Sequence, residues 1–276
     1  SYQSGRLTAP AETSAEKGEL RFVSLSLSYF PDEPPVLRNI NLVIRPREKV
    51  GIVGRTGAGK SSIVSVLFRL YDFDGRVELD GRDTKRMSLG SLRRSMSIIP
   101  QDPVLFGGSL RKNLDPFGEH SDGELWAALE AVQLRQLVAR HATGLELQVS
   151  EGGANFSVGQ RQLVCLARAI VRRNKLLVLD EATANVDPET GAFIQRTIAR
   201  QFAQCTVLTI AHRLITIVDS DRVLVLDRGQ VKEFGAPYEL LQNSGLFAQM
   251  VESSAQQAPR IKKLIEEAHK RRTSLL

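Results

Sequence analysis

Alternating apolar and polar residues occupy the beginning of the folded part of the chain. From Glu19 to Tyr29 apolar side chains recur at every second or third position, and after a Pro-rich turn at 31–35 the pattern resumes at 36–44. Alternation with a period near two is typical of strands with one buried face. We therefore predict a largely antiparallel β layer, which residues 76–79 join before the Asp80-Gly81 turn.

Short uninterrupted apolar runs form a second pattern. They lie at 50–53, 97–99, 176–179 and 206–210, and stretches with helical spacing separate them. Such runs are typical of strands that are buried on both faces, and their alternation with helices predicts a parallel sheet. Residues 223–226 and 231–234 flank an Arg228-Gly229 turn, so we expect them to form a hairpin.

Helical spacing of apolar residues dominates between these strands. It predicts a helix after residue 60 that extends to Leu70, a helical region over 110–140 and a helix over 161–173. A last amphipathic stretch begins at Pro259 and carries its apolar residues on one face, namely Ile261, Leu264, Ile265 and Ala268. For this stretch a solvated, frayed helix is the first interpretation, and contact with an anionic membrane surface or an acidic partner segment is the other.

The patterns together predict an α/β protein with a parallel-sheet core, an N-terminal antiparallel β layer and an inserted α-helical subdomain. Residues 1–17 lack periodicity and are interpreted as a linker. We assign 18–100 and 175–250 to the core with its β layer, 101–174 to the helical subdomain and 251–276 to a basic C-terminal tail.

Composition and charge narrow the possible partners. The net charge is +6, but residues 253–276 contain six Lys or Arg against two Glu, which leaves 31 basic and 29 acidic residues elsewhere. The main part of the chain is nearly neutral, so we expect no nucleic-acid partner.

Because no run of about eighteen apolar residues occurs, we expect a soluble, intracellular segment. Cys165 and Cys205 lie in apolar contexts and are expected to be buried, reduced thiols.

The segment that follows the apolar run 50–53 carries the clearest chemistry. It matches the P-loop pattern of Gly, four residues, Gly, Lys and Ser or Thr, and its residues are Gly54, Arg55, Thr56, Gly57, Ala58, Gly59, Lys60, Ser61 and Ser62. Glycines allow successive backbone N–H groups to face an anion, and the N-terminus of the following helix favours phosphate. We expect Lys60 to reach the β- and γ-phosphates of a nucleotide and the Ser61 hydroxyl to ligate Mg²⁺.

Polar residues follow several of the predicted parallel strands. Gln101 comes after 97–99, Asp180 and Glu181 come after 176–179, and His212 comes after 206–210. The carboxyl ends of parallel strands meet at one edge of the sheet, where ligands bind in such folds. An Asp at the end of an apolar strand is typical of the second Mg²⁺-holding motif of P-loop proteins.

These motifs, in this order and spacing, resemble the nucleotide-binding domain of an ABC transporter over about residues 19–251. The segments that carry the resemblance are the P-loop, Gln101, FSVGQRQ at 156–162, LLVLDE at 176–181, NVD at 185–187 and His212. The amino-acid sequences of several segments, such as GRTGAGKSS and EATANVD, resemble those of the second such domain in the C subfamily, the multidrug resistance-associated proteins. The resemblance implies a RecA-like P-loop NTPase core.

The resemblance also implies roles for individual residues. Tyr29 would stack on adenine, Gln101 would join Ser61 and Asp180 around Mg²⁺, and Glu181 would act as general base or orient the attacking water. His212 would contact the γ-phosphate. The Ser157, Gly159 and Gln160 segment would face the ATP bound to a second, opposing domain. Here Val158 stands where the family has Gly, and its side chain would crowd that contact.

An ATP-hydrolysing domain of a membrane exporter is therefore the leading hypothesis, with ATP and Mg²⁺ as its cofactors. Its implied partners are a second, non-identical nucleotide-binding domain and the coupling helices of a transmembrane domain, at the cytoplasmic face of a membrane. A domain that gates or regulates a channel is the alternative within the same subfamily. A soluble ABC ATPase of DNA repair or translation would need a coiled coil or a second P-loop, which this sequence does not contain.

Overall fold

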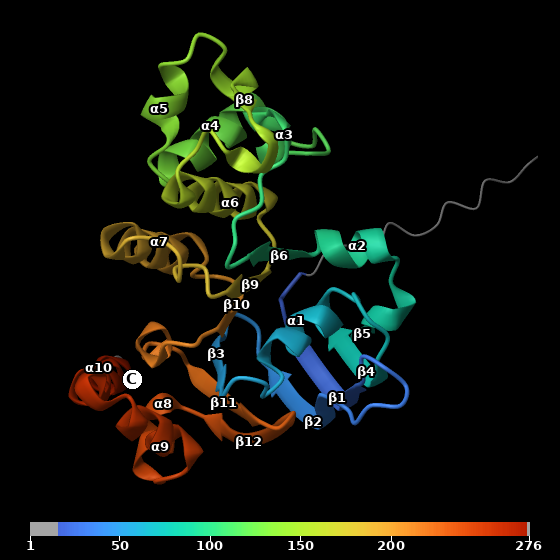
Figure 1. Cartoon of the computed structure of the whole chain (residues 1–276), viewed down its shortest axis with the longest axis vertical. Coiled ribbons are helices and arrows are strands. Elements are labelled where there is room, and N and C mark those ends of the chain that lie inside the picture. Colours follow the sequence, from blue (N-terminus) through green and yellow to red (C-terminus); the bar gives the residue numbers. More distant parts are fainter. Residues whose placement is uncertain (1–15, 275–276) are drawn as a thin grey trace, which may run out of the picture.

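Six strands form the central sheet of the computed structural model, which describes residues 16–274 (Figure 1). Their order is β12-β11-β3-β10-β9-β6, and every neighbouring pair is parallel except β11 and β12. The bounds are β3 Lys49–Gly54, β6 Met96–Ile99, β9 Leu176–Asp180, β10 Thr206–Ile210, β11 Arg222–Asp227 and β12 Gln230–Gly235. The predicted parallel-sheet core and its hairpin are confirmed.

A second, antiparallel sheet lies beside the central one. Its order is β2-β1-β4-β5, with bounds β1 Leu20–Leu27, β2 Leu37–Ile44, β4 Asp74–Leu79 and β5 Arg82–Asp83. Leu20, Phe22, Leu25 and Leu27 of β1 are buried, whereas the residues between them are mostly more exposed. The prediction of an N-terminal antiparallel β layer is confirmed, and it follows from this alternation.

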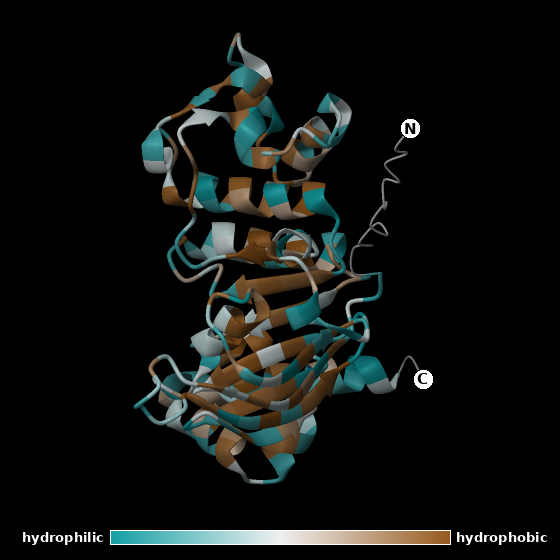
Figure 2. Ribbon diagram, turned by 90° about the vertical axis from the view of Figure 1, so that its right-hand side faces the viewer, coloured by the Kyte–Doolittle hydropathy of each residue, from teal (hydrophilic) through white to brown (hydrophobic). Residues whose placement is uncertain are grey.

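Helix α1 (Lys60–Leu67) packs into the apolar core shared by the two sheets. Figure 2 shows hydrophobic residues concentrated along the strands of both sheets. The helix ends three residues before Leu70, which is 55% exposed, so the prediction that the apolar stripe includes Leu70 is wrong. A 3-10 turn η1 (Thr84–Arg86) and helix α2 (Leu89–Arg94) then connect β4 and β5 to β6.

The predicted helical subdomain lies at the top of Figure 1, and its apolar side chains share one core with residues of β6, β9, β10 and α7. Its elements are β7 Gly108–Ser109, α3 Leu110–Leu114, α4 Asp122–Ala131, α5 Arg135–Ala139, η2 Gly144–Glu146, β8 Gln148–Val149, η3 Glu151–Gly153 and α6 Val158–Arg172. α6 contacts both α3 and α4 and also β6 of the central sheet. One helix therefore joins this subdomain to the strand that ends before Gln101.

The structure breaks the region 110–140 where the sequence predicts helix throughout. The carboxylate of Asp115 accepts hydrogen bonds from the backbone N–H groups of Glu119 and His120, and this local turn ends α3. Such side-chain bonds offer the backbone an alternative to helix, and Pro116 disfavours helix at the residue before it. A second break follows α4, where Gln133 has a φ of 60°.

Helix α6 begins three residues earlier than predicted. Ser157 and Gln160 form a reciprocal capping box, in which each side chain accepts the other's backbone N–H. Two backbone donors at the helix start are thereby satisfied, which fixes the first helical residue at Val158.

A third apolar core lies on the other face of β3 and β11, under the C-terminal helices. The remaining elements are α7 Pro188–Gln201, η4 Leu214–Ile217, α8 Pro237–Gln242, α9 Leu246–Ser253, η5 Ala255–Gln257 and α10 Ala258–Thr273. Ile261, Ile265 and Ala268 of α10 are at most 4% exposed and pack on α8 and α9. The interpretation of α10 as a solvated, frayed helix is therefore wrong.

Other expectations concern the chain ends, the thiols and membrane spans. Residues 1–15 of the predicted linker lie outside the described residues. The backbone N–H groups of Lys17 and Glu19 donate to the carboxylate of Asp80. Cys165 and Cys205 are buried free thiols, as expected. Across residues 16–274 no helix has the length and apolar character needed to cross a membrane.

Candidate functional site

The P-loop connects the carboxyl end of β3 to the first turn of α1. Gly57 and Gly59 have φ angles of 80° and 104°, in the left-handed region that favours glycine. Gly59 occupies the N-cap position of α1, and the described structure supplies no side-chain cap for the first N–H groups of this helix. These donors and the helix dipole together form a site suited to an anion.

Close packing explains the glycine at position 54. A Cβ atom on Gly54 would lie 2.4 Å from the backbone oxygen of Leu226, at the end of β11. A Cβ on Gly59 would lie 2.8 Å from the Leu37 side chain and 3.0 Å from the backbone oxygen of Val36. The loop is therefore held between both sheets, and it presents its backbone toward the carboxyl edge of β3.

Lys60 is 5% exposed, although it carries a charge. Its Nζ donates to the backbone oxygens of Gly54 at 2.6 Å and Arg55 at 3.3 Å, so the ammonium group lies within the loop that it follows. Burial lowers the pKa of Lys60 from its ordinary value. An anionic partner would stabilise a buried ammonium group that neutral carbonyls now hold.

Tyr29 lies two residues beyond the end of β1 and contacts the same helix. Its Oη is 2.8 Å from the Oγ of Ser62, and its ring packs edge-on against Tyr71 with 4.7 Å between centroids. Tyr71 is 50% exposed. The ring of Tyr29 is therefore held beside the start of α1, and its stacking on a base stays a prediction.

Glu181 and His212 meet at the carboxyl ends of β9 and β10. Oε1 of Glu181 accepts the backbone N–H of His212 at 2.7 Å and lies 3.1 Å from the Nε2 of the same residue. The Glu181 backbone has a φ of 49°, and its N–H donates to the oxygen of Ile210, the last residue of β10. The Glu181 side chain is 8% exposed, so its orientation is fixed by these contacts.

Asp180 and Lys60 lie within electrostatic range of His212. Burial raises the pKa of Asp180, and the charge of His212 opposes this rise. Burial lowers the pKa of His212, and Lys60 lowers it further while Asp180 raises it. The P-loop lysine, the strand-end aspartate and the histidine thus form one group of interacting charges.

The structure adds a buried amide that the sequence analysis missed. Gln162 of α6 is 1% exposed, and its Nε2 donates both to the oxygen of Pro100 at 2.8 Å and to that of Ala182 at 2.6 Å. Pro100 precedes Gln101, and Ala182 follows Glu181. One side chain therefore ties α6 to two segments of the candidate site. The sequence contained one signal for this role, because Gln162 is a polar residue at a position of α6 where its neighbours on the same face are apolar.

A second link joins the same two regions at the surface. Asn185 donates through Nδ2 to the Asp102 carboxylate at 3.0 Å. The sequence analysis singled out the NVD segment, but nothing in it pointed to Asp102. This contact connects the residue after Gln101 with the turn that precedes α7.

The segment 156–160 lies at the start of α6 and is organised around its own helix cap. The hydrogen bonds described for Ser157 and Gln160 join these two residues to each other, whereas Phe156 is buried in the core of the helical subdomain. Val158 is 38% exposed at the first helical position. An added Cβ on Gly159 would meet Thr190 of α7 and Ser157 at ordinary contact distances. The segment therefore presents an exposed surface that is separate from the P-loop contacts.

The residues at the sheet edge fit a nucleotide with a divalent cation. Ser61 and Gln101 are exposed, and together with Asp180 they supply the hydroxyl, amide and carboxylate oxygens that Mg²⁺ prefers. The described residues contain no cluster of three or more His, Cys, Asp or Glu side chains arranged for a metal. Mg²⁺ at phosphate sites typically uses one or two carboxylates, with phosphate oxygens and waters, so this donor set is compatible with it.

Several known proteins are similar to this chain in sequence. Residues 37–184 match the family described as "ABC transporter". The chain is 60% identical over 237 residues to "Probable multidrug resistance-associated protein lethal(2)03659" of Drosophila melanogaster, and 56% identical over 237 residues to "ATP-binding cassette sub-family C member 4" of Mus musculus. These alignments cover 85% and 86% of this chain but 17% and 18% of the relatives.

A solved structure shares the fold as well. The structure of "a bacterial Atm1-family ABC exporter with ATP bound" superimposes with a TM-score of 0.81 at 35% sequence identity, and the match covers 90% of this chain and 44% of that one. The chain thus spans less than a fifth of the length of the curated relatives named above. The family match covers more than half of the chain, from β2 to the turn after Glu181. The chain therefore belongs to the ABC transporter family, and its similarity extends to members of the C subfamily.

Proposed function

We propose that this chain is the ATP-binding and ATP-hydrolysing domain of a membrane exporter and lies at the cytoplasmic face of the membrane. Membership of the family implies ATP binding. The single observation that carries hydrolysis is the convergence of the P-loop, Asp180, Glu181 and His212 at the carboxyl ends of β3, β9 and β10. The channel-gating alternative is less well supported, because a similar solved structure is that of an exporter.

In this proposal the P-loop and α1 bind the nucleotide phosphates. Lys60 would exchange the carbonyls of Gly54 and Arg55 for phosphate oxygens, and the backbone donors at the start of α1 would bind the same group. Ser61, Gln101 and Asp180 would hold Mg²⁺, which when bound neutralises phosphate charge. The remaining P-loop residues, Arg55, Thr56, Gly57, Ala58, Gly59 and Ser62, would line the nucleotide, and Tyr29 would stack on its base.

Glu181 is the proposed general base. Its carboxylate already lies at the sheet edge, where the backbone N–H of His212 holds one of its oxygens. It would accept a proton from the attacking water or orient that water. His212 would contact the γ-phosphate, and Gln101 would contact the water and report nucleotide occupancy to the helical subdomain. Gln162 would support this communication because its amide bonds to both flanking segments.

The proposed partner for the site is a second nucleotide-binding domain. Ser157 is exposed and Gly159 and Gln160 are half-buried at the start of α6, where the side-chain bonds of Ser157 and Gln160 join these two residues to each other. We propose that this surface faces the ATP held by the partner domain, and that the partner supplies the equivalent segment to this chain's ATP. Because Val158 stands where the family has Gly, we propose that the partner is non-identical and supplies a Gly-containing segment.

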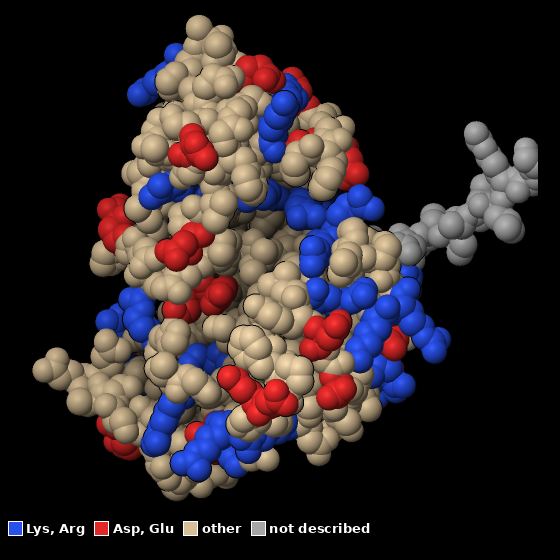
Figure 3. Space-filling view, turned by 45° about the vertical axis from the view of Figure 1, so that its right-hand side comes forward, with Lys and Arg blue, Asp and Glu red and all other residues tan. Residues whose placement is uncertain are grey.

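The proposed contact with the transmembrane domain is an exposed apolar surface beside the helical subdomain. Val104, Phe106 and Phe117 are 51%, 66% and 61% exposed, and the guanidinium of Arg94 lies 5.9 Å from the Phe117 ring. Figure 3 shows a hollow between the helical subdomain and the rest of the molecule, with Lys and Arg side chains along its rim. Exposed apolar side chains of this size mark interaction sites, and we propose that the coupling helices dock here.

Phosphate release from ATP, measured with and without Mg²⁺, tests the proposal. Lys60→Ala removes the ammonium from the loop, so we expect loss of ATP binding or of turnover. Lys232→Ala changes an exposed lysine on β12 and is the matched control. Equal ATP affinity and turnover in Lys60→Ala and the unaltered chain would contradict the assignment of the P-loop.

A further inference from the structure

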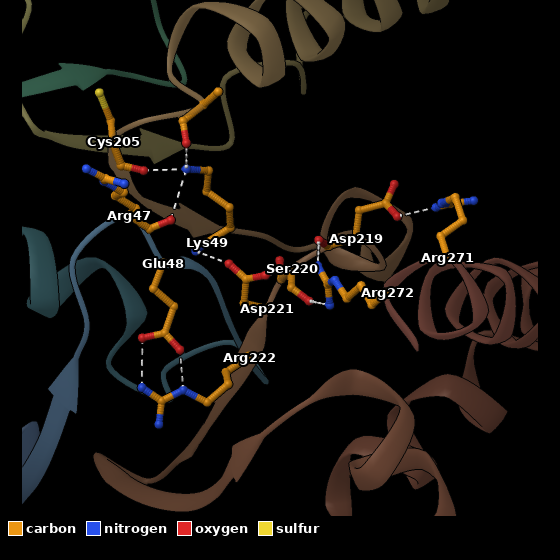
Figure 4. A network of polar contacts seen from close by, with 11 residues as sticks. Arg47, Glu48, Lys49, Cys205, Asp219, Ser220, Asp221, Arg222, Arg271 and Arg272 are labelled. Atoms are coloured by element: carbon orange, nitrogen blue, oxygen red, sulfur yellow. Dashed lines mark hydrogen bonds and ion pairs between the residues drawn. The ribbon is translucent and has the colours of Figure 1, made fainter. Parts of the chain in front are cut away.

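Two arginines attach the last turn of α10 to the loop 219–221 that precedes β11 (Figure 4). Arg271 Nη2 lies 2.7 Å from Oδ1 of Asp219. Arg272 donates to the backbone oxygens of Ser220 at 2.9 Å and Asp219 at 2.5 Å, and it lies 3.2 Å from Oδ1 of Asp221. The C-terminal end of the helix therefore depends on these two side chains for its contact with the loop.

The same loop also holds the strand that leads to the P-loop. Oδ2 of Asp221 accepts the backbone N–H of Lys49 at 2.7 Å, and the N–H of Asp221 donates to the oxygen of Lys49 at 2.7 Å. Lys49 is the first residue of β3. Loop 219–221 thus lies between the end of α10 and the start of the central strand, as Figure 4 shows.

We propose that Ser274 is a phosphorylation site for a basophilic serine kinase, and that its phosphate releases the last turn of α10 from loop 219–221. Arg271 and Arg272 lie three and two residues before Ser274, the spacing that kinases with acidic substrate grooves select. Ser274 is exposed and follows the last helical residue. Its Oγ donates to the oxygen of Arg271, whereas Thr273 Oγ1 bonds to the oxygens of both His269 and Lys270.

The last turn can open without unfolding the rest of the helix. The Arg271 and Asp219 side chains are 60% and 73% exposed, and those of Arg272 and Asp221 are 41% and 42% exposed. Ion pairs as exposed as these contribute little to stability. Ile261 and Ile265 are at most 1% exposed and anchor the preceding turns. A kinase could therefore bind the 271–274 segment in an extended conformation while α10 stays packed.

Phosphate transfer would change the charge balance at this end. The Oγ–P bond of Ser274 would form as the bond between the γ-phosphorus and the β,γ-bridging oxygen of ATP breaks; ADP leaves, and the hydroxyl proton passes to the kinase base. The product adds about −1.5 to −2 charges beside the negative end of the helix dipole. It would repel Asp219 and Asp221, and its oxygens would compete with them for Arg271 and Arg272.

The modification is tested on the full 276-residue chain with the catalytic subunit of cyclic-AMP-dependent protein kinase and ATP. We expect mass spectrometry to place one phosphate on Ser274, Ser274→Ala to lose it and the matched variant Thr273→Ala to keep it. Phosphate on Thr273 alone, or none on 271–274, would overturn the proposal. This test does not depend on the proposed function, because it measures modification rather than ATP turnover by the chain.

Release of the last turn is tested in two ways. Asp219→Asn removes the carboxylate that pairs with Arg271, so the initial rate of Ser274 phosphorylation should rise about threefold, while Asp227→Asn on β11 should not change it. Hydrogen exchange of amides 270–274 should become about tenfold faster after phosphorylation, while amides 261–265 stay protected. Unchanged exchange at 270–274 in the phosphorylated chain, or an unchanged rate in Asp219→Asn, would overturn the release.

Discussion

Glu181 and His212 are joined through both the backbone and the side chain of the histidine. The same carboxylate oxygen accepts the His212 backbone N–H at 2.7 Å and lies 3.1 Å from the ring Nε2. These residues follow adjacent parallel strands, β9 and β10, that pair in register from Thr206 and Leu176 onward. The register of the sheet therefore fixes the position of the proposed base relative to the proposed phosphate contact.

Glu181→Gln should retain ATP binding while hydrolysis falls on the order of a hundredfold or more, because an amide keeps the size of the side chain but cannot take a proton. Nucleotide binding and single-turnover hydrolysis, measured separately, check this. The dimer with the partner domain should also persist in ATP. Asp187→Asn, at the N-cap of α7, is a control for a carboxylate outside the catalytic group. Normal turnover in Glu181→Gln would assign the base to another residue.

His212 should make folding stability depend on pH. Its pKa is lowered by burial and by Lys60, against the opposing charge of Asp180, so near and below about pH 6.5 the unfolded chain binds more protons than the folded chain. Stability should therefore fall as the pH drops from about 7.5 to 5.5, and His212→Gln should reduce this loss. We expect a difference below about 1 kcal/mol, because the side chain is 54% exposed and solvent screens its charge.

Denaturant unfolding of both proteins at the two pH values measures this effect. His141→Gln, on an exposed turn of the helical subdomain, is the matched control. An identical pH dependence in His212→Gln and the unaltered chain would show that the histidine does not contribute.

Gln162→Leu should lower both stability and turnover, with a smaller effect on ATP affinity. The substitution removes the donor shared by Pro100 and Ala182 and leaves two carbonyl oxygens without it, at a cost of about 1–3 kcal/mol. Loss of the link should also weaken the positioning of Gln101 and Glu181. Thermal unfolding and steady-state kinetics check the two effects, and Gln136→Leu on α5 is an exposed control. A drop in stability with unchanged turnover would limit Gln162 to a structural role.

Val158→Gly should increase turnover of the isolated chain by about threefold to tenfold, because a self-dimer would then present a signature segment without the crowding side chain. Addition of a partner domain with a Gly-containing signature should increase the turnover of the unaltered chain. Phosphate release by the chain alone, the variant and the mixture checks both. Helix stability should fall by no more than about 1 kcal/mol. If the lone chain already matches the mixture and the variant changes nothing, a symmetric homodimer is the better description.

The sequence predicted the components of the candidate site better than their connections. The P-loop spacing, Asp180, Glu181 and His212 were identified because each follows a short apolar strand, and parallel strands end at one edge. Their roles in catalysis and binding stay predictions. Gln162 was missed because a buried polar residue in a helix pattern does not reveal which distant carbonyls it meets. The break at Asp115 was missed because local side-chain bonds replaced helix hydrogen bonds there.

The sequence by itself determined the buried strands of the parallel core, the alternating strands of the antiparallel layer and the glycine-dependent P-loop, because these depend on local backbone freedom and on periodicity. Tertiary structure decided the rest. Tyr29 meets Ser62 because α1 packs into the apolar core shared by the two sheets. Glu181 meets His212 because β9 and β10 are paired neighbours in the central sheet. The helix α10 looked solvated because its polar residues are highly charged, yet Ile261 and Ile265 find a partner surface on α8 and α9. Burial depends on the presence of such a surface, which no single segment specifies.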